Sequence, residues 1–347
     1  MFEDSNSVRS FCVSARTMFL GIDVGATWTR IAVADRDGSI VKKVRIPTPR
    51  EGSELSLVEA IIEVLGKEFR SYMDRIEAVG IGSIGPLDLS TGSIVNPPNL
   101  PIKRIELGKP LLEHLRRPVY VANDCVAAVW GEYLYGLGKG LENVVYVTLS
   151  TGIGGGIIVD GNLLLGKKGN AHEIGHIVVD SLRRLRCGCG GYGHWEAYCG
   201  GANIPRFATY LIERWSLGTE EKRSKVYQQY LEGSIRTETI FDEAKRGDPL
   251  ARKIVEEINR VNVAGFESVI NLYDPELIVV GGSIALNNPE LVLEPIKGIE
   301  YGRGALNEIP RIELTTFGDD VVLVGAIAIA SNPPKNLVKK LRYLEQL

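Results

Sequence analysis

One pattern occurs twice in the chain, and it restricts the fold more than any other feature. Residues 18–46 contain the apolar run MFLGIDV, the turn GATW, the run TRIAVAD and, after Asp37-Gly38, the run SIVKKVRI. Residues 144–165 repeat this order with VVYVTLS, TGIGGG, IIVDG and NLLL. Short β-rich runs separated by Gly or Asp-Gly are typical of hairpins. The repeat therefore predicts two related halves, each opening with antiparallel strands, and places a glycine turn over 151–156.

Strands and helices alternate in both halves. Apolar residues recur at helical spacing over 52–72 and 125–136, and again over 249–273, where Asp248-Pro249 is a helix-start signal. Buried strands are predicted at 78–85 and 275–282. This alternation predicts an α/β protein with two domains and a cleft between them.

We divide the chain accordingly into two predicted domains. The small domain comprises residues 18–122 and a C-terminal helix at about 333–347, and the large domain comprises 123–332. Residues 1–17 lack the apolar segment of a signal peptide and are expected to form a disordered extension before the first strand. Whether translation starts at Met1 or Met18 stays open.

Composition excludes several classes of protein. The 347 residues are 44% hydrophobic and 24% charged, which is typical of a globular enzyme. The net charge is −3 without a basic stripe, which argues against nucleic-acid binding. No apolar run is long enough to span a membrane. The odd number of cysteines, five, fits a reducing cytoplasm.

The stretch from 172 to 196, HEIGHIVVDSLRRLRCGCGGYGHWE, contains a predicted metal site. Thiolates and imidazoles at short spacing are ligands that Zn²⁺ selects, and the glycines allow the backbone to fold tightly around them. A Cys187–Cys189 disulfide is the alternative, but it is strained at this spacing. The predicted ligands of a closed, structural zinc site are His176, Cys187, Cys189 and His194, with Cys199 as a substitute.

The two glycine turns predict a polyphosphate site. Backbone N–H groups in such a turn can hold an anion when no Cβ blocks its approach. In the first copy Asp23 stands beside Gly25 and Thr27, and in the second Thr151 precedes Gly152 and Gly154. Facing turns would clamp a polyphosphate, with Asp23 holding Mg²⁺ through water. The pattern GxxxxGK[ST] is missing from the sequence, which excludes a P-loop protein.

Asn123 and Asp124 follow a buried strand and open a helix. Asp124 is either a helix N-cap or a general base that takes a proton from an attacking hydroxyl. Asn123 would then bond a neighbouring hydroxyl.

Four segments together resemble the ROK family of sugar kinases, within the actin-like ATPase superfamily, along almost the whole chain from Met18 onward. They are GIDVGATWTR, VTLSTGIGGGIIVDG, LYDPELIVVGGSI, and HEIGH followed by CGCGGYGHWE. The resemblance implies two ribonuclease-H-like domains around a cleft, and an ATP-dependent kinase acting on the 6-hydroxyl of glucose or other hexoses. N-acetylmannosamine, N-acetylglucosamine or fructose kinases are the near alternatives, and a non-catalytic sugar-sensing regulator is the alternative of another class.

The resemblance also implies roles for individual residues. Asp124 is the catalytic base, and the adenine site lies near Gly281 and Gly282. The implied sugar-binding residues are Asn99, Asn123, Asp124, Glu173, His176 and Glu196. The implied ligands are a sugar, ATP, Mg²⁺ and structural Zn²⁺, and a homodimer or homotetramer stays open.

Three residues depart from the family pattern. His194 stands where a third cysteine is usual, and the set remains a good zinc set. Ala26 and Trp28 replace the usual glycine and lysine, and the sequence offers no account of Trp28.

Overall fold

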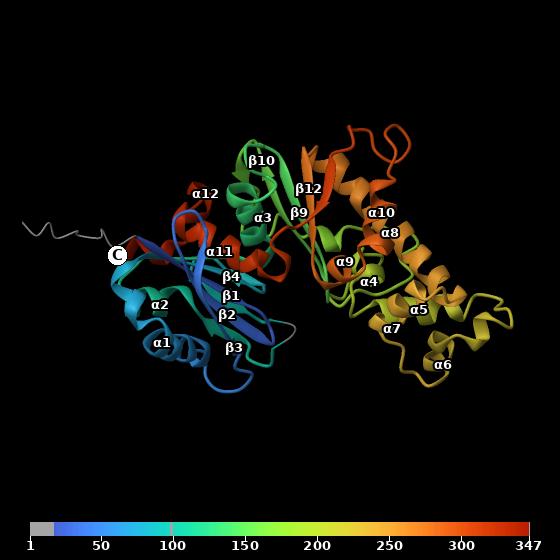
Figure 1. The fold of residues 1–347 in the computed structure, drawn as a ribbon, viewed down its shortest axis with the longest axis horizontal. Coiled ribbons are helices and arrows are strands. Elements are labelled where there is room, and N and C mark those ends of the chain that lie inside the picture. The colour runs from blue at the N-terminus through green and yellow to red at the C-terminus, as the bar shows by residue number, and fades with distance from the viewer. Residues whose placement is uncertain (1–16, 98–99, 347) are drawn as a thin grey trace, which may run out of the picture.

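The computed structural model describes residues 17–97 and 100–346. Its two five-stranded sheets lie in the two halves of the molecule (Figure 1). The predicted N-terminal extension, apart from Thr17, lies outside the described residues. No helix among the described residues is long and apolar enough to cross a membrane.

The first sheet has the strand order β3-β2-β1-β4-β8. Strands β1 to β3 are antiparallel, whereas β4 is parallel to both β1 and β8. Every residue of β1 is buried, as expected for a central strand. The strands are β1 (Met18–Val24), β2 (Trp28–Ala34), β3 (Ile40–Pro47), β4 (Ile76–Ser83) and β8 (Val119–Asn123).

The second sheet has the corresponding order β11-β10-β9-β12-β13, again with three antiparallel strands followed by parallel ones. The internal duplication and the α/β class are therefore confirmed. The strands are β9 (Val144–Leu149), β10 (Ile153–Val159), β11 (Asn162–Leu163), β12 (Leu277–Gly281) and β13 (Arg311–Leu314). A small third sheet contains β5 (Leu87–Asp88), β6 (Ser93–Val95) and β7 (Arg104–Glu106).

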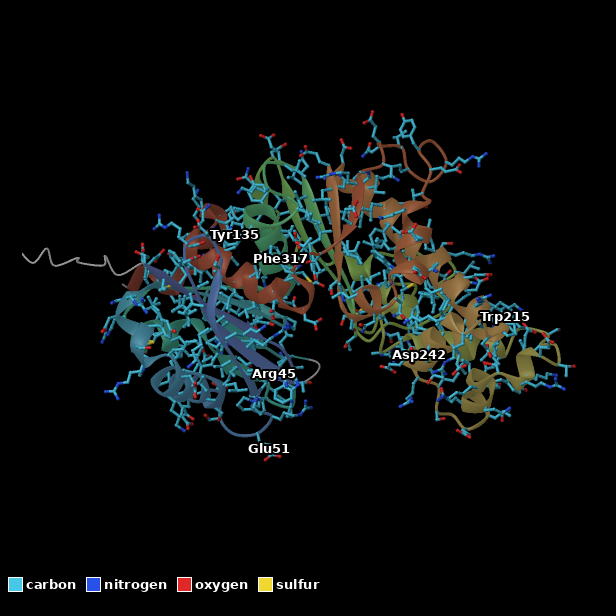
Figure 2. The ribbon with its side chains drawn as sticks, viewed as in Figure 1. Arg45, Glu51, Tyr135, Trp215, Asp242 and Phe317 are labelled. Atoms are coloured by element: carbon cyan, nitrogen blue, oxygen red, sulfur yellow. The ribbon has the colours of Figure 1, made fainter. Side chains whose placement is uncertain are left out.

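Helices α3 (Asp124–Tyr135) and α11 (Val321–Ser331) lie between the two sheets (Figure 1). They cross where Gly131 meets Gly325, and a Cβ at Gly325 would overlap the backbone of Ala127. At the end of α3, the Tyr135 hydroxyl lies 2.5 Å from that of Ser331 (Figure 2). Small residues thus let the two helices approach closely.

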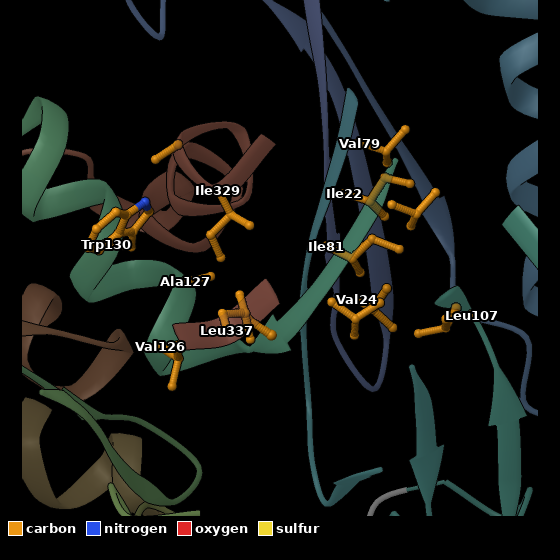
Figure 3. Packing of buried hydrophobic residues seen from close by; sticks show 14 of the residues in the cluster. Ile22, Val24, Val79, Ile81, Leu107, Val126, Ala127, Trp130, Ile329 and Leu337 are labelled. Carbon is orange, nitrogen blue, oxygen red and sulfur yellow. The ribbon is translucent and has the colours of Figure 1, made fainter. Parts of the chain in front are cut away.

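The hydrophobic cores follow the alternation of side chains along the strands. Val144 and Tyr146 face α3 and belong to the core of the first half, which also contains Trp130 and Ile329 (Figure 3). Val145 and the neighbouring alternate residues belong to a second core on the opposite face, which the long helix α8 (Pro249–Tyr273) covers. The second sheet is therefore buried on both faces.

The remaining helices are placed outside these sheets. Their bounds are α1 (Ser56–Glu68), α2 (Gly108–Leu115), α4 (Glu196–Cys199), α5 (Ile204–Ile212), α6 (Lys225–Leu231), α7 (Thr237–Lys245), α9 (Ser283–Asn287), α10 (Pro289–Lys297) and α12 (Lys335–Val338). Short 3-10 turns cover Arg70–Arg75, Ile174–His176, Glu221–Arg223, Gly318–Asp320 and Arg342–Gln346.

The prediction of a single C-terminal helix at about 333–347 is wrong. Only α12 and a 3-10 turn form there, because Pro333 and Pro334 delay the helix start and the chain then turns toward the first half. The Tyr343 hydroxyl donates to the carbonyl of Val119 at 2.8 Å, so this end of the chain packs on the small half. That contact supports the division into domains, which stays a proposal.

The glycine turn expected over 151–156 is also shorter than predicted. Strand β10 begins at Ile153, and Gly154, Gly155 and Gly156 are strand residues. A Cβ at Gly154 or Gly156 would overlap Cys125, and one at Gly155 would overlap Ile174. These glycines therefore allow β10 to pack closely on its neighbours rather than to turn.

Candidate functional site

A pocket between the two halves begins where parallel strands β4 and β8 end. The last residues of these strands, Ser83 and Asn123, are register partners. The pocket is lined by Gly85 after β4 and by Asn123, and from the second half by Asn170 and Glu173. Crevices at the carboxyl ends of parallel strands are common ligand sites in α/β proteins.

Asn123, and not Asp124, is the N-cap of α3. Its side-chain oxygen accepts from the backbone N–H groups of Cys125 at 2.9 Å and Val126 at 3.4 Å. Asp124 is the first helical residue, and one carboxylate oxygen accepts from the N–H of Cys125 at 2.8 Å. Asp124 is therefore free of the capping role, which favours a chemical one.

The surroundings of Asp124 suit a proton acceptor. Burial raises the pKa of Asp124, and the N–H of Cys125 opposes this effect. A carboxylate with a raised pKa is a better base than one in water. The negative charge of Glu173 also raises this pKa.

The first glycine turn joins β1 to β2, and Asp23 lies beside it. The guanidinium of Arg30 contacts Asp23 Oδ2 at 2.8 Å and also bonds the carbonyl of Asp319 at 2.5 Å. Burial raises the pKa of Asp23 from 3.8 to about 7, even though Arg30 lowers it. Arg30 thus holds the carboxylate in place and ties the turn to the start of α11.

The second glycine turn, Ser150 to Gly152, lies against two further glycine segments. Gly201 N donates to the carbonyl of Ser150 at 2.8 Å, and the hydroxyls of Ser150 and Ser283 are 3.2 Å apart. Gly282 has φ +88°, a conformation that favours glycine, and a Cβ there would overlap Leu149. The predicted adenine residues Gly281 and Gly282 are thereby adjacent to this turn.

The four predicted zinc ligands converge. The potential ligand atoms of His176, Cys187, Cys189 and His194 all lie within 4.8 Å of one another. Nδ1 of His176 is 3.7 Å from Cys187 Sγ, and Nδ1 of His194 is 3.2 Å from Cys189 Sγ. Two thiolates and two imidazoles in this arrangement form a donor set that suits four-coordinate zinc.

Two glutamates connect the cluster to its surroundings. Glu173 Oε2 lies 3.7 Å from Nε2 of His176, the ring nitrogen that faces away from the cluster. A carboxylate in that position fixes the orientation of a ligating imidazole. Glu196 contacts Cys187 Sγ at 3.6 Å through one oxygen and accepts from Ile153 N at 2.9 Å through the other. Glu196 therefore links the cluster to the second glycine turn.

The structure groups the predicted site residues unequally. Asn123 and Glu173 line one pocket with Asp124 beside it. His176 is a member of the cysteine–histidine cluster, and Glu196 contacts that cluster through Cys187. Asn99 lies outside the described residues. The sequence analysis did not identify Gly85 and Asn170 in the pocket, or Arg30 beside Asp23. Gly85 could have been found from the sequence Gly-Ser-Ile-Gly-Pro (82–86), which is a loop signal at the end of a strand.

Known proteins are similar to this chain over most of its length. The family model described as "ROK family" matches residues 19–332. The chain belongs to the ROK family. A glucokinase from Pyrobaculum calidifontis is 45% identical over 92% of this chain and 97% of its own length.

Two solved structures of ROK proteins are also similar. A ROK glucokinase from Streptomyces griseus, in complex with glucose and AMPPNP, is 31% identical with a TM-score of 0.72, covering 90% of this chain and 99% of that one. A ROK hexokinase from Thermus thermophilus is 32% identical with a TM-score of 0.74, covering 90% and 98%. The fold is therefore that of the ROK kinases.

Proposed function

We propose that this protein catalyses the ATP-dependent phosphorylation of the 6-hydroxyl of glucose. The observation that carries the proposal is the position of Asp124. Its carboxylate is half-buried, is not the N-cap of α3, and lies beside a polar pocket at the ends of β4 and β8. The similarity to the Pyrobaculum glucokinase and to the Streptomyces glucokinase with bound glucose and AMPPNP supports glucose as acceptor and ATP as donor.

In this proposal the sugar occupies the pocket next to Asp124. Glu173, His176 and Glu196 would hold sugar hydroxyls together with Asn99, because a hexose needs several polar partners when it leaves water. The oxygen of Asn123 caps α3, so its amide nitrogen would be the group that donates to a hydroxyl. Asp124 would then accept the proton of the 6-hydroxyl as this oxygen attacks the γ-phosphorus of ATP.

The donor would lie between the two glycine turns. Gly25 and Thr27 would contact the phosphates from the first half, and Thr151, Gly152 and Gly154 from the second. Gly281 and Gly282 would lie beside the adenine. Asp23 suits Mg²⁺, because a single carboxylate combined with phosphate oxygens is a common magnesium site and only Oδ2 is paired with Arg30. Bound Mg²⁺ neutralises charge on the phosphates.

The cysteine–histidine cluster would hold a structural zinc ion. Four protein ligands leave no open coordination position, so the metal would stabilise the loop and not react. This role fits Glu173 and Glu196, which both contact members of the cluster. The chemistry would then take place beside the metal, at Asp124.

The test is formation of sugar 6-phosphate with Mg-ATP and purified, zinc-loaded protein. Glucose, mannose, fructose, N-acetylglucosamine and N-acetylmannosamine should be compared in parallel. Turnover with glucose at least tenfold above the N-acetyl sugars is the expected result. Turnover only with an N-acetyl sugar would overturn the substrate and keep the mechanism, and no turnover with any sugar would favour a sugar-sensing regulator.

A further inference from the structure

Three cations and an exposed tryptophan share one face of the first sheet next to the glycine turn. In the antiparallel register, Arg30 is paired with Arg45 and Ala32 with Lys43. Cross-strand partners project to the same face, and alternate residues along a strand do the same. Trp28, which follows the turn directly, Arg30, Lys43 and Arg45 therefore lie on one side of β2 and β3.

Two of these cations are neutralised by carboxylates. Arg30 contacts Asp23 at 2.8 Å, and Lys43 contacts Asp320 at 2.6 Å. Among the residues that the structure describes, Arg45 makes no ion pair, and its guanidinium lies over the Trp28 ring at 4.2 Å. The face thus has a surplus positive charge.

The fold places this surplus charge where it is unfavourable. Like charges directly opposite each other in an antiparallel pair are destabilising, and Arg45 is directly opposite Arg30. The Trp28 side chain is 42% exposed, so the stacked pair is at the surface and contributes little to a core. Among the described residues Arg45 thus has an aromatic contact but no carboxylate partner, which leaves its charge available to an external anion.

Arg45 is also held in a fixed position relative to the turn. Thr48, three residues later on the same segment, donates its N–H to the carbonyl of Thr27 at 3.0 Å and its hydroxyl to that of Gly25 at 2.8 Å. Figure 2 shows Arg45 at the edge of the first sheet that is directed toward the second half. A planar guanidinium stacked on an aromatic ring keeps its N–H edge free for a phosphate.

We propose that Arg45, held by Trp28, binds the phosphate chain of the nucleoside triphosphate. This inference rests on the proposed donor site and adds a phosphate-binding residue to it. It also accounts for Trp28, since the ring stands where the family pattern has lysine and Arg45 supplies the positive charge from the neighbouring strand. The proposed anion is a phosphate because the turn beside Asp23 is already built to face one.

The test compares Arg45→Gln with Arg36→Gln as a matched control. Arg36 is also an exposed arginine over an aromatic ring, that of Phe19, but it lies at the opposite end of β2, in the turn toward β3. The dissociation constant of Mg-AMPPNP is measured by calorimetry at two salt concentrations, and the KM values for ATP and glucose are measured in turnover assays.

Arg45→Gln should raise the AMPPNP dissociation constant and the ATP KM about tenfold, with less salt dependence than the wild type. The glucose KM should change less than about twofold, and the melting temperature should not fall, because a like-charge pair is removed. Arg45→Lys should recover part of the affinity, and Arg36→Gln should leave it unchanged.

Two results would overturn the inference: AMPPNP affinity within twofold of wild type in Arg45→Gln, or no AMPPNP binding by the wild type. If the wild type binds AMPPNP but phosphorylates no sugar, only the proposed function fails, and the binding comparison still decides the role of Arg45.

Discussion

Asp23→Asn is expected to stabilise the nucleotide-free protein more strongly at pH 8 than at pH 5. The Asp23 side chain is 7% exposed, and burial raises its pKa from 3.8 to about 7 despite the contact with Arg30. Between these values the folded state keeps a proton that the unfolded state has lost. The ionisation of Asp23 therefore lowers the free energy of unfolding progressively as the pH rises from 3.8 to 7. Above pH 7 this destabilisation stays constant.

The size of the effect follows from the shift. A change from 3.8 to about 7 is about 3 pH units, or about 4 kcal/mol at pH 8, of which about 3 kcal/mol arises between pH 5 and pH 7. Asparagine removes this term at the same volume. This shift already includes the favourable contact of the carboxylate with Arg30, so the loss of that contact requires no separate deduction, and Arg30 keeps its bond to the Asp319 carbonyl. The variant should therefore gain about 4 kcal/mol at pH 8 and about 1–2 kcal/mol at pH 5.

Urea unfolding followed by tryptophan fluorescence, without nucleotide or added magnesium, measures this difference. Asp320→Asn is the control, because Asp320 also contacts Arg30 but its side chain is 31% exposed. The same Asp23→Asn protein should lose Mg-ATP-dependent turnover. A free energy difference between variant and wild type that is the same at pH 5 and pH 8 would refute the reasoning.

Three further predictions concern catalysis, metal and packing. Asp124→Asn should lower kcat by about 10²–10⁴-fold while calorimetry still detects the binding of AMPPNP and glucose, and a folded variant that turns over at the wild-type rate would exclude Asp124 as the general base. In the wild type, activity should rise as the pH increases through the raised pKa of Asp124. Replacing Cys187 and Cys189 by Ser should reduce bound zinc, measured by atomic absorption, and lower the melting temperature and glucose affinity together, whereas retained zinc with unchanged melting would contradict the ligand set. Gly325→Ala should destabilise the protein by about 3 kcal/mol or more, because its Cβ overlaps the Ala127 backbone, and an unchanged melting temperature would contradict this packing.

The features that were predictable from sequence depend on local chemistry. Helix α8 has the expected bounds because Asp248 caps it, accepting from Ala251 N at 2.8 Å, and Pro249 starts it. The convergence of His176, Cys187, Cys189 and His194 was predictable because cysteine and histidine at short spacing have few other uses. The hairpin order of both sheets followed from the repeated turns.

The features that were missed depend on distant contacts. The glycines after Ile153 look like a turn, but they are strand residues. Glycine is required at these positions because Cys125 on α3 and Ile174 leave no room for a Cβ. A single helix was predicted at about 333–347, yet Tyr343 in this segment bonds Val119, which is 224 residues away. No local pattern carries such information.

Two charged side chains link the proposed sugar and nucleotide sites, whose residues are far apart in sequence. Glu196 follows His194, the last of the proposed zinc ligands, by two residues, and its carboxylate accepts from Ile153 N, at the end of the second glycine turn. Because the same carboxylate contacts Cys187 Sγ, a metal that fixes Cys187 also fixes the turn. In the first half, Arg30 joins Asp23 to the start of α11. Helix α11 packs on α3, the helix that begins with Asp124. Each phosphate turn is therefore tied to a proposed sugar-binding residue through one buried or half-buried charged side chain, so loss of either Glu196 or Arg30 should disturb both substrates and not one.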